Sequence, residues 1–262
     1  MNNIIKSLNY QVRRDIVTYI AIFGGILVAF LPIFEIDAEG IKELNGGMYA
    51  NQYLALMLLV PYIMSCLIGA CVIGKDMGDK TINYEVLSGH PRSQVFWGRV
   101  ITAFAWDIGL CILVSAVPIA LVTLINGWGK NIVFAHFLAR YVIIIVGAFR
   151  ILSFVVLITT VMRHPVAGGF ISYGVLNFST IPLLLLEELF DKKLYHVLAM
   201  ADIFYLSEFT NMVSMVENGE KIPRYDLSVP SSFFVVSIVV SIAVSAVYLI
   251  LAYLIFKKRD MR

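Results

Sequence analysis

Six apolar runs dominate the sequence, and each is long enough for a helix that crosses a lipid bilayer, which takes about 20 residues. A hydrophobic content of 60% and a mean hydropathy of +0.84 exceed what the core of one soluble domain holds. These values argue against soluble enzymes and nucleic-acid binding proteins. The pattern predicts an all-α polytopic membrane protein, in which residues 1–262 form a single domain with spans over 16–34, 53–74, 100–125, 141–162, 166–186 and 231–256.

The basic residues are distributed unevenly between the two sides that these spans define. With the N-terminus inside, the inner segments hold twelve basic and five acidic residues, and the outer segments hold seven basic and twelve acidic ones. Loops rich in Lys and Arg stay in the cytoplasm. Both termini are therefore predicted to be cytoplasmic.

Two segments outside the spans have apolar residues at helical spacing. The first, 1–15, is predicted to be an interfacial helix whose basic residues meet anionic lipid headgroups. The second, 187–229, is too charged to cross the bilayer and is predicted to form an outer amphipathic helical hairpin, with helices near 188–200 and 202–217. The apolar stripe of the first segment consists of Ile4, Ile5, Leu8 and Val12.

The inner loop 75–99, between the second and third spans, contains much of the remaining polar sequence. It is predicted to contain one short helix, because Asp79 can accept hydrogen bonds from a first turn and because Ile82 and Val86 share a face. The Gly-His-Pro sequence at 89–91 ends that helix. A short helix between two spans offers a contact by which a soluble partner can move a membrane domain.

The same loop carries three short blocks of sequence in order: Asp79-Lys80-Thr81-Ile82, then Val86-Leu87-Ser88, then Pro91-Arg92-Ser93. This order resembles the Glu…Gly-Thr-Ile…Leu…Pro-x-Ser-Arg loop of the ABC-2 type transport permeases. Those proteins are six-helix membrane subunits of about this length that pair with a separate ATPase. Asp79 stands where the family often has Gly, and Arg92 precedes Ser93 instead of following it.

The resemblance implies a permease subunit of an ATP-driven exporter in a bacterial plasma membrane, without enzymatic activity or a nucleotide site of its own. ATP and Mg would bind to two copies of a partner ABC ATPase, and a second permease chain, identical or homologous, would complete the transporter. The implied cargo is amphipathic: a bacteriocin or other antimicrobial peptide, as in self-immunity, or a lipid-like molecule. The residues implied to couple to the ATPase are Asp79, Lys80, Thr81, Ile82, Tyr84, Glu85, Val86, Leu87, His90 and Arg92, with the helix 1–15 beside them.

Polar residues inside the spans form two groups. Asp107 and Arg150 are the charged residues well within a span, and they are predicted to pair because an unpaired charge in a bilayer is costly. Such a pair is either a fixed structural contact or a polar element of the transport path. Small residues four positions apart in the sixth span predict close helix packing, against a second copy of the chain or along a pathway. These residues are Ser237, Ser241 and Ser245.

Two other classes of membrane protein have a comparable number of spans. Glu187-Glu188-x3-Lys192 resembles the signature of the CAAX-type intramembrane proteases, but it lies at an outer span end and no intramembrane His accompanies it. An ion channel or ion-coupled carrier would need more intramembrane carboxylates than Asp107 alone. The three cysteines fall within apolar runs and lack the spacing of a zinc site or a disulfide framework. They are Cys66, Cys71 and Cys111.

Overall fold

The computed structural model is a bundle of long helices with one β-hairpin, and it describes residues 2–34, 45–51, 60, 63–79, 81–130, 132–190, 211–217 and 220–258. The elements in chain order are α1 (Asn2–Arg14), α2 (Ile16–Phe34), the π-helical turn η1 (Ser65–Gly69), α5 (Ala70–Gly78), α6 (Ile82–Leu87), α7 (Arg92–Asn126), α8 (Phe134–Met162), α9 (Pro165–Phe190), β1 (Asn211–Glu217), β2 (Glu220–Asp226) and α12 (Ser231–Lys258).

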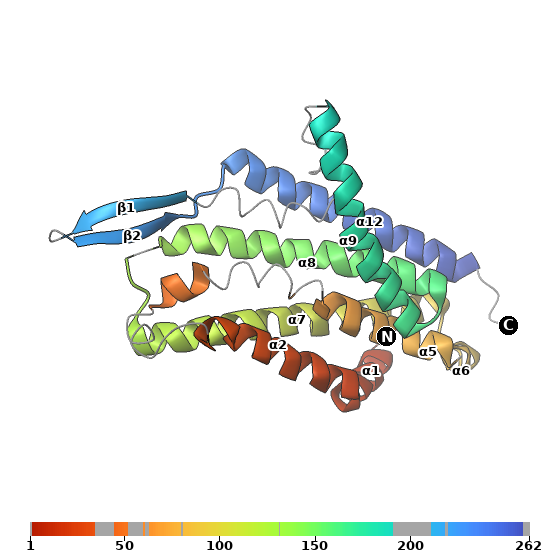
Figure 1. The fold of residues 1–262 in the computed structure, drawn as a ribbon. Coiled ribbons are helices and arrows are strands. Elements are labelled where there is room, and N and C mark those ends of the chain that lie inside the picture. Colours follow the sequence, from red (N-terminus) through yellow and green to blue (C-terminus); the bar gives the residue numbers. More distant parts are fainter. Residues whose placement is uncertain are drawn as a thin grey trace.

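The long helices α2, α7, α8 and α12 lie side by side, and α9 crosses α8 at a steep angle (Figure 1). The helices α1, α5 and α6 lie at the same end of the bundle as the last turn of α12, and we call this the inner end (Figure 1). The hairpin of β1 and β2 extends from the opposite, outer end. At the inner end, Nη1 of Arg92 donates to the carbonyl oxygen of Lys257 at 3.0 Å. The first helix, the loop 75–99 and the end of the last helix therefore share one end, in agreement with the predicted topology.

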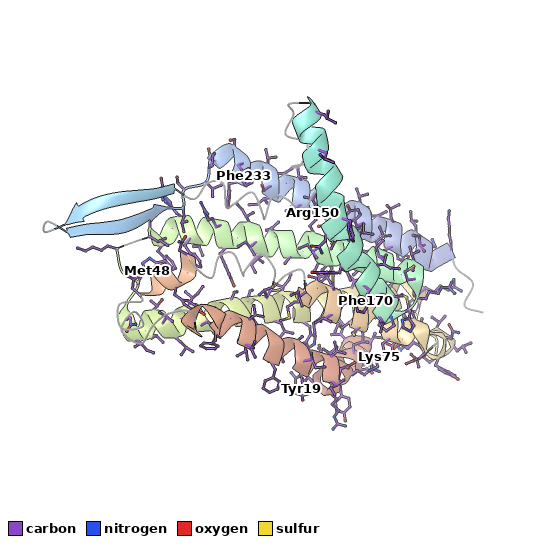
Figure 2. All side chains as sticks on the ribbon, viewed as in Figure 1. Tyr19, Met48, Lys75, Arg150, Phe170 and Phe233 are labelled. Atoms are coloured by element: carbon purple, nitrogen blue, oxygen red, sulfur yellow. The ribbon has the colours of Figure 1, made fainter. Side chains whose placement is uncertain are left out.

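Among the described residues, the helices α7, α8 and α12 are long and apolar enough to cross a membrane, and α2 adds a shorter apolar stretch, Ile16–Phe30. Large apolar side chains are exposed along α2, α7, α9 and α12. One of them, Tyr19, projects from α2 away from the bundle (Figure 2). An apolar surface of this extent requires lipid around it. The protein is therefore embedded in a membrane, as its composition predicts.

Predicted spans and observed helices agree in place more closely than in length. The helix α2 coincides with the predicted span 16–34, whereas α7 and α8 begin earlier than predicted, at Arg92 and Phe134. Hydropathy shows which residues can lie in contact with lipid, but the ends of a helix depend on caps and turns. A helix can therefore continue past the apolar run. For the predicted span 53–74, residues 53–59, 61 and 62 lie outside the described residues, and the remainder is helical from 63 onward, with η1 inside it.

The outer segment 187–229 differs from the predicted helical hairpin. The helix α9 continues to Phe190, and β1 pairs with β2 in an antiparallel hairpin. The helix predicted near 202–217 is therefore wrong over 211–217, and residues 191–210 lie outside the described residues. The physical reason is local: Asn218-Gly219, the dipeptide most typical of two-residue hairpin connections, stands between two segments rich in Val, Met, Ile and Tyr.

Arg140 attaches the base of the hairpin to α8. Its side chain is buried, and its Nε donates to the carbonyl oxygen of Leu227 at 2.8 Å. Nearby, Nδ1 of His136 lies 3.5 Å from Oδ1 of Asp226. Because Leu227 connects β2 to α12, these contacts join the outer end of α8 to the start of α12.

The serines of α12 lie at a contact within the chain. Ser237, Ser241 and Ser245 are buried, and α12 packs along α8 over much of its length. The hydroxyl of Ser245 donates to the carbonyl oxygen of Ser241 at 2.6 Å, so it is satisfied within its own helix. Close packing is confirmed, but its assignment to a second copy is wrong, because α8 of the same chain already covers this face.

Candidate functional site

The inner loop forms the short helix that its sequence predicts. The helix α6 follows Thr81 and ends at Leu87, with Ser88 as its C-cap, and Gly89 has φ of +94°, a left-handed conformation that glycine adopts without strain. Pro91 then precedes α7 in an extended conformation, with ψ of 142°. Ile82 is buried and Val86 is half-buried against the core, so the predicted apolar face of α6 is confirmed.

The predicted cap of this helix is wrong. Asp79 closes α5, where its backbone N–H donates to the carbonyl oxygen of Lys75 at 3.0 Å. Thr81 stands at the start of α6 instead, and its Oγ1 donates to Oδ1 of Asp76 at 3.0 Å. The difference arises because α5 continues to Gly78 and leaves only a short connection. Lys80 lies outside the described residues.

Arg99 joins the three helices of the inner loop. Its side chain is 1% exposed, although it lies within the second turn of α7. Nη2 is 2.8 Å from Oδ2 of Asp76 on α5, and Nη1 is 2.6 Å from Oε2 of Glu85 on α6. Nη1 also contacts the carbonyl oxygen of Val95 at 3.3 Å. One guanidinium group therefore holds α5 and α6 against the start of α7, and we call Asp76, Glu85 and Arg99 the inner triad.

Arg99 does not belong to the coupling set predicted from the sequence, where it counts only as one of the inner basic charges. A local signal is present: Val95, Arg99 and Thr102 lie three and four residues apart and are all buried, so Arg99 occupies the inward face of α7. A basic residue on the apolar face of a helix indicates a buried acidic partner.

The outer face of α6 is apolar and exposed. Tyr84 is 74% exposed and Leu87 is 81% exposed, and their three-residue spacing places them on one side of the helix. The opposite side is attached to the bundle through Ile82 and the inner triad. A rigid helix with two exposed apolar side chains at the inner end is suited to contact with another protein.

His90 and Arg92, which complete the predicted coupling set, both make hydrogen bonds within the protein. His90 is half-buried, and its backbone N–H donates to the carbonyl oxygen of Glu85 at 3.2 Å. Arg92 is also half-buried and bonds to the end of α12. The structure thus brings the described members of the predicted set, all except Lys80, together at one end; Tyr84 and Leu87 are exposed there, and Ile82 and Glu85 hold the loop to the bundle.

The N-terminal helix α1 packs on α7. Ile4, Leu8 and Val12 are buried, which confirms the predicted stripe, and Nε1 of Trp106 donates to Oδ1 of Asn9 at 2.8 Å. Protein covers the apolar stripe, and contact of the basic residues with anionic headgroups stays a prediction. The exposed face carries basic residues, including Arg14, whose guanidinium carbon lies 4.3 Å from the centre of the Tyr10 ring.

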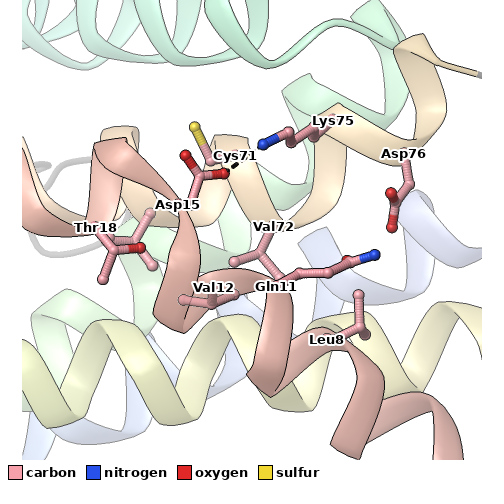
Figure 3. Close-up of a pocket in the computed structure, with 10 residues that line it drawn as sticks. Leu8, Gln11, Val12, Asp15, Thr18, Cys71, Val72, Lys75 and Asp76 are labelled. Carbon is pink, nitrogen blue, oxygen red and sulfur yellow. Dashed lines mark hydrogen bonds and ion pairs between the residues drawn. The ribbon is translucent and has the colours of Figure 1, made fainter.

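A second ion pair lies beside α1, at the start of α2. Nζ of Lys75 donates to Oδ2 of Asp15 at 2.7 Å, and the N–H of Val17 donates to Oδ1 at 3.2 Å. Figure 3 shows the pair at the edge of a small cleft between α1, α2 and α5. Burial raises the pKa of Asp15, but the Lys75 bond, the Val17 N–H and the Lys75 charge outweigh it, so the pKa lies below its usual value. The bond from Asp15 raises the pKa of Lys75.

These pKa shifts predict that the contribution of the Asp15–Lys75 pair to stability is constant over a middle range of pH and falls on either side of it. Asp15, with a lowered pKa, contributes above its unfolded pKa of about 4, and Lys75, with a raised pKa, contributes below about 10. We therefore expect Lys75→Met to lower the melting temperature between about pH 5 and about pH 9, and the difference from the wild type to vanish at both extremes. The effect is below about 1 kcal/mol because Lys75 is largely exposed.

Thermal melts of the two proteins across this range test the expectation. Lys258→Met is the matched control, because it removes an exposed lysine at the same end of the bundle. If the difference between Lys75→Met and the wild type were unchanged at acidic and alkaline extremes, the Asp15–Lys75 bond would not be its cause.

Inside the bundle, the predicted Asp107–Arg150 ion pair is not formed. Oδ2 of Asp107 accepts a hydrogen bond from Oγ of Ser65 at 2.7 Å, and Oδ1 has no partner. Arg150 is also buried and its Nε makes no hydrogen bond. The sequence places both residues at comparable depths, but η1 packs against α7 and brings Ser65 to the carboxyl group.

Neither the known protein families nor the curated proteins include a match to this sequence. The functional argument therefore rests on the residues of the inner end and on the loop motif.

Proposed function

We propose that this chain is the permease subunit of an ATP-driven exporter of the ABC-2 type. The observation that carries the proposal is the inner triad: buried Arg99 fixes α6 between two helices of the bundle while Tyr84 and Leu87 remain exposed. A separate ATPase would dock on that exposed face. The resemblance of the loop sequence to the coupling loop of the family supports the same role.

The inner triad suits mechanical coupling. If α6 were linked to the bundle by flexible loops, a push on it would be absorbed by the loops. Because Arg99 binds Asp76 on α5 and Glu85 on α6, a displacement of α6 is transmitted to α5 and α7 together. Closure of two ATPase subunits on ATP and Mg would then tilt these helices and change access to a pathway.

The proposal includes six membrane spans in a bacterial plasma membrane, with both termini in the cytoplasm. Besides α7, α8 and α12, the other spans are α2, the helix that contains η1 and α5, and α9. The working unit is two permease chains, identical or homologous, with two ATPase copies. The serines of α12 are used within the chain, so the contact between permeases would involve another face.

The proposed cargo is amphipathic: a peptide such as a bacteriocin, or a lipid-like molecule. A cleft of about 290 Å³ near the inner end supports this choice. It lies between α2, the turn η1 and α9, and its lining is almost entirely apolar. Val17, Leu67 and Phe170 are among its lining residues. A cleft of this kind suits the apolar part of a cargo taken from the membrane.

Co-purification tests the proposed function. The full-length chain, expressed with an affinity tag from its native host and solubilised in a mild detergent, is expected to retain an ABC ATPase whose hydrolysis depends on the permease. Recovery without any ATPase, under conditions that keep the helices folded, would reject the exporter. Proteolysis or ion flux by the purified chain alone would support the intramembrane protease or the channel instead.

A further inference from the structure

Asp107 lies near the middle of α7, the 35-residue helix that crosses the bundle. Its side chain is 0% exposed. Asp107 is fifteen residues beyond Arg92, the first residue of α7, which corresponds to about 22 Å along a helix. An aspartate at this depth is far from water at either end of α7 and must be stabilised by its neighbours.

The neighbours provide one hydrogen bond and no countercharge. Oγ of Ser65 donates to Oδ2 at 2.7 Å, while Oδ1 is buried without a partner. The ion pairs of the described residues use Asp15, Asp76, Glu85 and Asp226, and none of them includes Asp107.

Within the part of the chain that the structure describes, the titratable groups that interact with Asp107 are thiols. Cys66 follows Ser65 in η1, and Cys111 lies one turn further along α7. From α8, the charged residue expected at this level is Arg150, and it does not bond to Asp107. Neutral thiols and a hydroxyl cannot balance a negative charge in a medium of low dielectric constant.

An ionised carboxylate with one oxygen unpaired is strongly unfavourable in such a site, and a buried acid without a countercharge becomes neutral instead. We propose that Asp107 is a proton-binding site in the membrane-embedded core. The proton resides on Oδ1, and Oδ2 accepts from Ser65. The carboxyl group keeps the proton while α7 is packed on η1, and it releases the proton to water when the two separate.

The position of the site gives this proton a structural effect. The turn η1 contacts α2, α7, α8 and α9, and it continues directly into α5. The continuous segment of η1 and α5 is held to α7 at two points, Ser65–Asp107 in the core and Asp76–Arg99 at the inner end. Ionisation of Asp107 would leave an uncompensated charge buried at the first contact, which favours separation of η1 from α7, and it would leave the second contact intact. Helix packing in the core therefore depends on proton binding, and this conclusion does not rest on the proposed exporter function.

Infrared spectroscopy of the full-length chain in lipid nanodiscs tests the proposal directly. At about pH 7 an ordinary aspartate is ionised, but the wild type is expected to show the carbonyl stretching band of a protonated carboxyl group at this pH. Asp107→Asn should remove this band, because it is a neutral isostere with no titrating proton. Ser65→Ala should keep the band and move it to higher frequency, because the carbonyl oxygen loses its donor.

Thermal melts provide the second measurement. Between about pH 5 and about pH 7, where the Asp15–Lys75 pair contributes constantly, the melting temperature of the wild type should fall, because Asp107 is ionised in the unfolded chain and protonated in the folded one, and that of Asp107→Asn should stay level. If Asp107→Asn does not fold, Ser65→Ala carries the test through its band shift. Absence of the band in the wild type overturns the proposal. A melting temperature that rises with NaCl or KCl but not with choline chloride, and only when Asp107 is present, also overturns it in favour of a bound cation.

Discussion

Replacing Arg99 with methionine is expected to destabilise the protein by about 2–4 kcal/mol, because removing one partner of a buried ion pair leaves the others without compensation. Arg99 is the only cation that the two carboxylates of the inner triad share within 4 Å among the described residues. Methionine fills a similar volume, so loss of charge rather than a cavity dominates. Thermal melts in detergent or nanodiscs measure the effect, and stimulation of the proposed partner ATPase by this chain should fall with it.

Two controls separate the triad from a general effect of charge. Arg13→Met removes an exposed arginine at the same end and should leave the melting temperature unchanged. The triple variant Asp76→Asn, Glu85→Gln, Arg99→Met should recover much of the stability, because removing all charged partners together leaves no unpaired charge. If Arg99→Met melts at the wild-type temperature, the triad does not hold the loop.

Truncating both exposed apolar side chains of α6, as Tyr84→Ala with Leu87→Ala, is expected to weaken binding of the proposed ATPase by about 30- to 1000-fold, since truncation of an interface anchor costs about 1–2 kcal/mol each. The fold should be unaffected because both side chains point away from the bundle. Co-purification with the ATPase and ATP hydrolysis by the reconstituted complex measure the loss, and a melt of the permease alone verifies the fold.

The matched control lies at the other end of the molecule. Leu124 and Ile125, in the last turn of α7, are 82% and 79% exposed, so Leu124→Ala with Ile125→Ala removes a similar apolar area from the outer end. This variant should bind the ATPase as the wild type does. Equal losses in the two double variants would mean that α6 is not the docking surface.

Features that depend on neighbouring residues in the chain can be predicted from the sequence. The apolar stripe of α1, with Ile4 and Leu8, and the end of α6 at Gly89 are both correct, because helical periodicity and turn chemistry act within a few residues. The hairpin of β1 and β2 shows the same rule in a failed prediction. Asn218-Gly219 is a strong local signal for a hairpin, whereas the spacing of the apolar residues around it favours a helix.

The contact partner of a buried side chain, and the helix that covers a given helix face, could not be predicted in this way. The cost of an unpaired charge in a bilayer predicts a pair of Asp107 with Arg150, yet the carboxyl group meets Ser65, more than 40 residues away in the chain. The stripe of Ser237, Ser241 and Ser245 was correctly predicted to pack closely, and only the fold shows that α8 covers it. Periodicity places residues on a face of a helix and does not say which helix that face meets.

Three features follow from the amino-acid sequence alone: the chain lies in a membrane, most of its long helices can be located, and a short helix lies within the inner loop. Apolar length, charge distribution and turn residues are local quantities, and each acts before the helices meet. Three other features are seen only in the folded chain. Arg99 holds the short helix to the bundle, Asp107 has no countercharge, and the outer segment contains a hairpin held by Arg140. These contacts join residues far apart in the chain, and the packing of the helices selects among many partners that the sequence allows.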